Sequence, residues 1–119
     1  MNKFYYIATC DSCKRILQTL NLPENVSLRE IKKEPLTVKE LDSMHALAGS
    51  YEALFSRRAK LYKERGLKDE NLDEADFRRF ILEHYTFLKR PVLIFNNNIF
   101  IGNSPKTVEA ARAAIKQEK

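Results

Sequence analysis

The sequence has little of what membrane-spanning, disulfide-rich or collagen-like proteins require. Its 119 residues include no tryptophan, two cysteines, three glycines and four prolines. No apolar run approaches the ~20 residues of a membrane span, because the best candidates, Phe4–Ala8 and Pro91–Phe95, are as short as strands. The apolar stretch after Lys3 is also too short for a signal peptide. These absences predict a cytoplasmic protein that does not associate with membranes.

What remains is the composition of a globular domain. Hydrophobic residues make up 44% of the chain and charged residues 31%, as in ordinary folded domains. A chain of this length buries roughly two-thirds of the surface that its unfolded form exposes. One core therefore suffices without disulfides or metal ions, and we expect a single domain over residues 1–119 in which cysteine is free for chemistry.

The chain is basic, but its positive charge is dispersed. Its 21 lysines and arginines exceed its 16 acidic residues and give a net charge of +5. The basic residues come in short groups rather than in the sustained block typical of a DNA-binding arm. We therefore expect the chain to bind anions or protein partners, without direct sequence-specific binding of nucleic acid. The groups are Lys32-Lys33, Arg57-Arg58-Lys60, Arg78-Arg79 and Lys89-Arg90.

The first thirty residues have the pattern of a β-α-β unit. Phe4–Ala8 is a continuous apolar run, typical of a strand buried on both faces. From Asp11 the apolar residues recur at helical spacing, with Asp11 or Ser12 as the N-cap, until Pro23 ends the helix. Polar and apolar residues alternate over Val26–Leu28, which predicts a second strand. So short a strand-helix-strand sequence implies a parallel crossover.

The middle of the chain is expected to be helical. Thr37–Glu40 has the spacing of a capping box, and Gly49 can end the helix that it starts. Shorter helical pieces are predicted at residues 52–56, 59–65 and 73–84.

The last third predicts a β-hairpin followed by a helix. Two apolar strands, at residues 92–95 and 99–102, flank three asparagines that tolerate the left-handed dihedral angles of a turn. Ser104 can cap the final helix, and Pro105 suits its first position.

The most informative motif is Cys10-Asp11-Ser12-Cys13, between the first predicted strand and helix. A sulfur at this turn faces unpaired backbone N–H groups and the positive end of the helix dipole, which favour thiolate over thiol. Cys10 is therefore the candidate nucleophile. Cys13 lies one turn on, near enough to attack a mixed disulfide at Cys10, and is the candidate resolving thiol.

Two plainer interpretations compete with redox chemistry. The cysteines could form half of a zinc site, but the chain adds only His45 and His84, whose separation matches no zinc-finger spacing. They could also be inert buried residues. The position of the C-x-x-C at the first strand-to-helix turn favours redox chemistry.

Arginines at two predicted element starts are candidates for anion binding. Pro91 begins a predicted strand, where the N–H that proline lacks is not needed for pairing. Its peptide bond with Arg90 can be cis, and the rigid proline ring constrains the backbone of Arg90. Arg57 and Arg58 stand at a predicted helix start. A guanidinium aimed at Cys10 would stabilise its thiolate and bind a tetrahedral oxyanion in a bidentate way. A solvated surface charge is the plainer alternative for each arginine.

Taken together, these motifs resemble the arsenate reductase (ArsC)/Spx family. Besides Cys10–Cys13, the likeness includes Glu34–Thr37, Leu54–Arg58 and Lys89–Val92, and it covers essentially the whole chain. The resemblance implies an α/β, thioredoxin-like fold, βαβ…ββα, with a helical insertion at roughly residues 37–86 between the two halves.

For function, the resemblance implies a thiol-dependent reductase of the arsenate reductase kind. Cys10 would attack the small oxyanion, glutathione or glutaredoxin would be the external reductant with no bound cofactor or metal, and Arg90 and Arg58 would match two oxyanion-binding arginines, with Arg57 the alternative to Arg58. Ser12 joins them as a candidate oxyanion contact. The third arginine usual in these reductases would fall near Asn103.

Cys13 points to the other branch of the family. It makes a dithiol with Cys10, as in the Spx regulators that bind the RNA polymerase α subunit. The alternative function is therefore a redox-sensing regulator in which a Cys10–Cys13 disulfide alters a binding surface. A thioredoxin-like module with idle cysteines is the third possibility.

Overall fold

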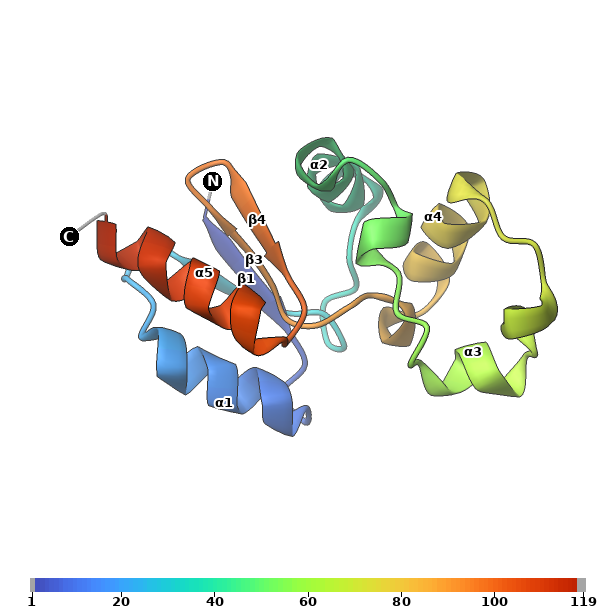
Figure 1. The fold of residues 1–119 in the computed structure, drawn as a ribbon, viewed down its shortest axis with the longest axis horizontal. Helices are drawn as coiled ribbons and strands as arrows, with labels where there is room; N and C mark the ends of the chain where they lie inside the picture. The colour runs from blue at the N-terminus through green and yellow to red at the C-terminus, as the bar shows by residue number, and fades with distance from the viewer. Residues whose placement is uncertain (1, 118–119) are drawn as a thin grey trace. The chain divides into compact units, whose positions relative to one another are not determined.

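A computed structural model describes residues 2–117 of the chain, which form two compact units. The two ends of the chain, up to Glu34 and from Arg90 onward, make the first unit, and Pro35–Lys89 make the second. Figure 1 shows the sheet of the first unit and the helices of the second. In the part that the structure describes, no helix is long and apolar enough to cross a membrane.

The first unit is a four-stranded sheet in the order β2-β1-β3-β4. β1 pairs in parallel with β2 and antiparallel with β3, and β3 pairs antiparallel with β4. This arrangement confirms the predicted α/β, thioredoxin-like class. The elements are β1 (Lys3–Tyr6), α1 (Asp11–Leu20), β2 (Ser27–Glu30), β3 (Val92–Phe95), β4 (Asn98–Ile101) and α5 (Pro105–Gln117).

The core of the first unit lies between the sheet and the two helices α1 and α5, which cover the same face (Figure 1). Phe4 and Leu93 are direct neighbours on β1 and β3 and point into this core. The helices contribute residues at helical spacing, as their amphipathic sequences predict. The buried members are Phe4, Ile16, Leu20, Val26, Leu93, Phe95, Ala111 and Ile115.

The second unit consists of short helices around an aromatic cluster. Phe55 is fully buried and contacts Phe77, Phe87 and Tyr62, with its ring stacked on that of Phe87 at 5.6 Å between centroids. The elements are α2 (Val38–Ala48), the 3₁₀ turn η1 (Glu52–Leu54), α3 (Lys60–Glu64), η2 (Leu67–Asp69), α4 (Glu74–Glu83) and η3 (Tyr85–Phe87).

Two sequence signals at helix ends are confirmed. Thr37 and Glu40 form the capping box of α2, and Gly49 ends that helix at φ 91°, a left-handed conformation that suits glycine. In the hairpin, Asn96 and Asn97 have φ of 50° and 66°, as a tight turn between β3 and β4 requires.

Other boundaries differ from the predictions. β1 ends at Tyr6 rather than Ala8 because the chain turns there: the Cys10 N–H donates to the Ile7 carbonyl at 3.0 Å. The predicted helix at residues 52–56 is only the 3₁₀ turn η1. It ends because Phe55 is extended and pairs with Leu88 in an isolated β-bridge.

Candidate functional site

Cys10 is the N-cap of α1. Its backbone is extended, at φ −88° and ψ 111°, and its Sγ accepts a hydrogen bond from the Cys13 N–H at 3.4 Å. The prediction that Asp11 or Ser12 caps this helix is therefore wrong, because both follow the cap within the first turn. The correction matters chemically, since a cap side chain faces the unpaired N–H groups of the helix.

Cys13, in the first turn of α1, adjoins Cys10. It is fully buried, and no disulfide joins it to Cys10. The pKa of the Cys13 thiol is raised to about 12: burial is the largest cause and the adjoining Cys10 adds to it, while a hydrogen bond with the Ile7 backbone and the charge of Arg90 act in the opposite direction. Cys13 is therefore a neutral thiol at pH 7, whereas Cys10 is partly exposed and open to a reagent.

Arg90 and Pro91 belong to the same unit as the cysteines. The Arg90–Pro91 peptide bond is cis, Pro91 is buried, and its carbonyl accepts the Gly102 N–H at 2.9 Å. Arg90 itself is half-buried, and its positive charge favours an ionised Cys13. The first unit thus brings Arg90 to the cysteine turn, which also carries the half-buried Ser12.

Arg57 and Arg58 lie in the second unit and have different surroundings. The Arg57 guanidinium forms an ion pair with Glu52 at 2.8 Å and stands 5.4 Å from the ring centroid of Phe77. The Glu52 carboxylate raises the pKa of Arg57. Arg58 is exposed, and within residues 2–117 its guanidinium has no such partner. Asn103, in the first unit, is an exposed neutral residue.

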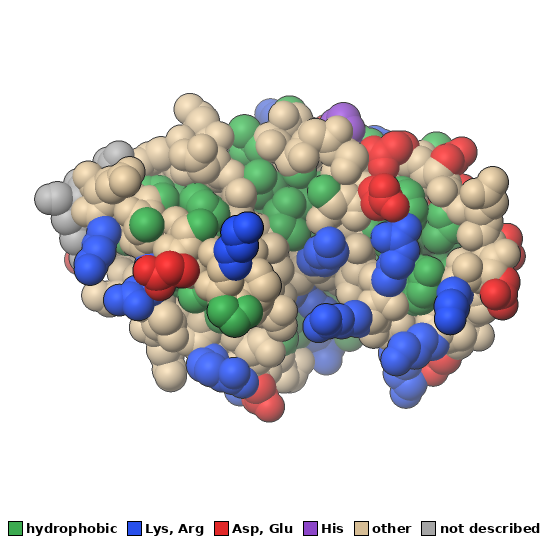
Figure 2. Space-filling view, viewed as in Figure 1, with side chains coloured by type: hydrophobic (Ala, Val, Ile, Leu, Met, Phe, Trp, Pro, Cys, Tyr) green, Lys and Arg blue, Asp and Glu red, His purple; other side chains and the backbone are tan. Residues whose placement is uncertain are grey.

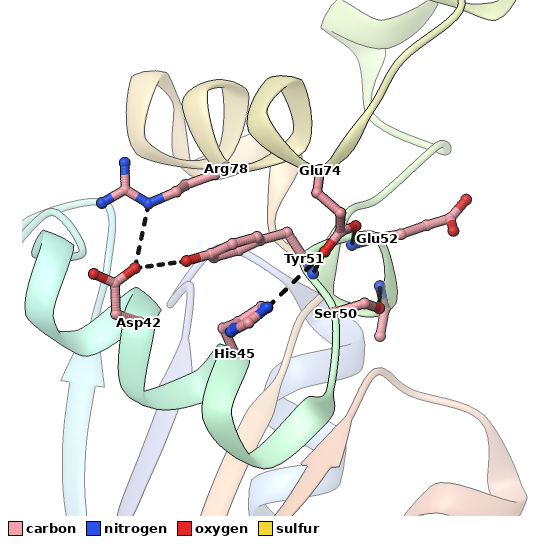
Figure 3. A network of polar contacts seen from close by, with 8 residues as sticks. Asp42, His45, Ser50, Tyr51, Glu52, Glu74 and Arg78 are labelled. Carbon is pink, nitrogen blue, oxygen red and sulfur yellow. Dashed lines mark hydrogen bonds and ion pairs between the residues drawn. The ribbon is translucent and has the colours of Figure 1, made fainter.

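Sequence reasoning missed a polar network in the second unit (Figure 3). One oxygen of Asp42 accepts hydrogen bonds from the Tyr51 hydroxyl at 2.7 Å and from Arg78 Nε at 3.3 Å. Tyr51 and Arg78 hold the pKa of Asp42 below its ordinary value, and Asp42 raises the pKa of Tyr51. No local motif could reveal this network, because Asp42 and Arg78 are 36 positions apart.

Two further observations bear on what the chain can bind. Among the described residues, no group of three or more His, Cys, Asp or Glu side chains is placed to hold a metal ion. Figure 2 shows both basic and acidic side chains exposed on the face that it draws.

Comparisons with known proteins agree with this geometry. The family model described as "ArsC family" matches residues 5–111. The chain belongs to the ArsC family. An arsenate reductase from Haemophilus influenzae is 30% identical over 102 residues, covering 81% of this chain and 88% of the relative. The global transcriptional regulator Spx 2 of Bacillus anthracis is 29% identical over 101 residues, covering 82% and 76%.

Solved structures show the same fold. An arsenate reductase from Vibrio cholerae superposes with a TM-score of 0.76 at 22% identity, covering 92% of this chain and 96% of its own. The YFFB (PA3664) protein gives a TM-score of 0.78 at 21% identity, covering 97% and 99%. With its two adjacent free thiols, this ArsC-family chain is of the thiol oxidoreductase kind, and relatives from both branches match it to a similar degree.

Proposed function

We propose that this ArsC-family chain is a thiol-dependent reductase of a small oxyanion, with arsenate as the first substrate to test and Cys10 as the nucleophile. The observation that carries the proposal is the position of the Cys10 sulfur at the N-cap of α1, 3.4 Å from the Cys13 backbone nitrogen. Backbone N–H groups and the helix dipole stabilise negative charge there. Cysteines in such places are reactive nucleophiles.

The proposed reaction begins at arsenic. The Cys10 thiolate forms an S–As bond, and one As–O bond breaks as a protonated oxygen leaves as water. A glutathione thiolate then attacks Cys10 Sγ. The S–As bond breaks, its electron pair stays on arsenic, and As(V) becomes As(III). The two sulfurs are oxidised to a mixed disulfide between Cys10 and glutathione.

Cys13 has a place in the last stage. Its sulfur attacks Cys10 Sγ, and the departing glutathione thiolate takes up the proton that Cys13 loses. Glutathione or glutaredoxin then supplies the two electrons that reduce the Cys10–Cys13 disulfide. Because burial keeps Cys13 protonated, we expect this step to be slow beside direct attack by abundant glutathione. The cycle requires a compartment that keeps thiols reduced, such as the cytoplasm.

Oxyanion binding is assigned to arginine. We propose Arg90 for the first unit, with Ser12 as a hydrogen-bond donor from the first turn of α1, and Arg58 as an anion-binding guanidinium of the second unit. Asn103 supplies no charge where the resemblance places a third arginine. One missing charge-assisted contact weakens oxyanion binding by about 1.5–3 kcal/mol. Arsenate is therefore expected to bind with low affinity, and a different thiol-reactive oxyanion can be the better substrate.

The test is glutathione- and glutaredoxin-coupled arsenate reduction by the wild type and two cysteine variants. Cys10→Ser should lose turnover by at least about a thousandfold, because serine is a far weaker nucleophile. Cys13→Ser, the matched control, should lose about tenfold or less when glutathione is abundant. Turnover that survives in Cys10→Ser refutes the proposal.

A second candidate function is a redox-controlled regulator that binds RNA polymerase. The second thiol, Cys13, supports it, together with Spx relatives that match as well as the reductases do. In this hypothesis a Cys10–Cys13 disulfide changes affinity without turnover. Polymerase pull-downs with oxidised, reduced and cysteine-free protein test it, and equal recovery from all three removes redox control.

A further inference from the structure

The segment that carries Arg57 and Arg58 is held by a carboxylate from a distant helix. Glu74, the first residue of α4, accepts the Tyr51 N–H at 2.6 Å through Oε1 and the Glu52 N–H at 3.0 Å through Oε2 (Figure 3). No side chain of its own caps η1 at Tyr51. The Glu74 carboxylate therefore binds two backbone N–H groups at the start of this turn, and hydrogen bonds to an ionised acceptor are the stronger kind.

Neighbouring contacts fix the same turn from other sides. Ser50 Oγ accepts the Ala53 N–H at 3.1 Å. The ring of His45 stacks on that of Tyr51, with centroids 4.1 Å apart, and its Nε2 lies 4.0 Å from Glu74 Oε1. Tyr51 is also tied to Asp42 through its hydroxyl. These contacts hold the backbone of Tyr51 and Glu52, which precedes the two arginines in the chain.

The next link in the chain of contacts is Glu52. Its backbone N–H is held by Glu74, and its carboxylate binds the Arg57 guanidinium at 2.8 Å. Phe77, one turn after Glu74 on α4, lies under the same guanidinium at 5.4 Å from its ring centroid. The guanidinium of Arg57 is therefore already paired within the protein, with one carboxylate and one aromatic ring.

Arg58 sits between two anchored neighbours. On one side, the side chain of Arg57 is tied down and the Ser56 N–H donates to the Phe87 carbonyl at 2.8 Å. On the other side, Ala59 is buried. The guanidinium of Arg58, exposed and unpartnered within the described residues, is presented by a fixed backbone. Such preorganisation lowers the ordering cost of binding.

From these contacts we infer that Glu74, through Glu52 and Arg57, is a positioning residue that presents the Arg58 guanidinium to a tetrahedral oxyanion. The inference rests on the proposed function, in which Arg58 binds the anion, and it adds the residues that hold this arginine in place. Arg58 is the binding residue, and Arg57 acts through its neighbours.

The test is an NMR titration with inorganic phosphate, a tetrahedral oxyanion that thiols do not reduce. In the reduced wild type, the Nε–H signal of Arg58 should shift saturably, while that of Arg57 should not move. Glu74→Gln should weaken this binding by at least about threefold, because an amide offers one acceptor and no charge. Amide hydrogen exchange at Tyr51 and Glu52 should accelerate in the same variant.

The matched control is Glu83→Gln. It lies on the same helix, removes the same charge and breaks an ion pair with Arg65 at 2.6 Å, and within residues 2–117 no hydrogen bond or ion pair joins it to η1. Phosphate affinity at Arg58 should stay within about 1.5-fold of the wild type. Equal effects of Glu74→Gln and Glu83→Gln would show that net charge or general stability is responsible, and they overturn the inference.

Two more variants test the chain of contacts should Glu74→Gln fail to fold. Glu52→Gln interrupts it one link later and should also weaken phosphate binding at Arg58. Arg57→Lys keeps a cation beside Glu52 and should bind phosphate better than Arg57→Ala. A saturable shift at Arg57, or none at Arg58, overturns the inference.

Phosphate binding does not require Cys10. Failure of the phosphate test is therefore distinct from turnover that survives in Cys10→Ser, which refutes the reductase proposal.

Discussion

The two units are stabilised in different ways. The first has an apolar core between a sheet and two helices, and its candidate nucleophile, Cys10, adjoins a buried neutral thiol. The second surrounds Phe55 with aromatic rings and adds ion pairs across its surface, such as Arg65–Glu83 and Arg78–Asp42. The first unit should therefore be sensitive to alkaline pH through its thiol, and the second to acid and salt through its carboxylates.

The largest expected effect tests whether the two units unfold together. Phe55→Ala removes the centre of the aromatic cluster and should cost about 3–5 kcal/mol, the usual range for a buried phenylalanine. Phe95→Ala, at an equally buried position in the first unit, is the matched variant. Hydrogen exchange should show protection lost within the unit that carries each substitution. Uniform loss in both units, from either variant, would mean that they form one cooperative structure.

The second-largest expected effect is a loss of folding stability in the first unit at high pH. The pKa of Cys13 rises from 9.0 to about 12 on folding, so the fold favours the neutral thiol. The corresponding stability is fully present below pH 9 and is lost as the pH rises toward 12. At about 1.4 kcal/mol per pKa unit, the loss approaches 4 kcal/mol.

Denaturant unfolding between pH 8 and 11 measures this loss. The wild type and Cys10→Ser should lose stability more steeply than Cys13→Ala, in which no thiol must ionise. The difference between the slopes isolates Cys13 from the lysines and tyrosines that titrate in the same range. Parallel slopes in all three proteins contradict the assignment.

The sequence predicted the first unit better than the second. The strands, the hairpin and the turn that carries Cys10 depend on local patterns: apolar runs, an asparagine turn and a C-x-x-C spacing. The polar contacts of the second unit depend on tertiary structure, since Glu74 binds the backbone of Tyr51, which precedes it by 23 positions. Local periodicity carries no information about such pairs.

The same distinction explains the error at the start of α1. Side-chain preference favours Asp11 or Ser12 as a cap over cysteine. The backbone instead turns at Ile7, where the carbonyl accepts the Cys10 N–H, and this places the sulfur at the cap position. The proposed nucleophile here occupies a place where local propensity favours another residue type. Likewise, the resemblance favoured Arg58 and left Arg57 as its alternative, and the contact of Arg57 with Glu52 distinguishes the two.

The smallest expected effect concerns acid sensitivity in the second unit. Tyr51 and Arg78 hold the pKa of Asp42 below its ordinary value of 3.8, so this carboxylate adds stability above that pH and the contribution is lost as the pH falls below it. Asp42→Asn keeps an acceptor for the Tyr51 hydroxyl but has no charge to lose. The protection of the Tyr51 amide, relative to its intrinsic exchange rate at each pH, should therefore fall more between pH 5 and pH 2 in the wild type than in the variant.

High salt distinguishes the contribution of the Asp42 charge from that of its hydrogen bonds. The side chains of Asp42 and Arg78 are 48% and 37% exposed, so their attraction is screened and its contribution is small. In 1 M salt, where the screening length is about 3 Å, the wild type and Asp42→Asn should show nearly the same acid dependence at Tyr51. The aromatic contacts of Phe55 are not ionic and should persist. A difference at Tyr51 that survives high salt would mean that the carboxylate acts through hydrogen-bond geometry rather than charge, and the contrast between the units would then rest on packing alone.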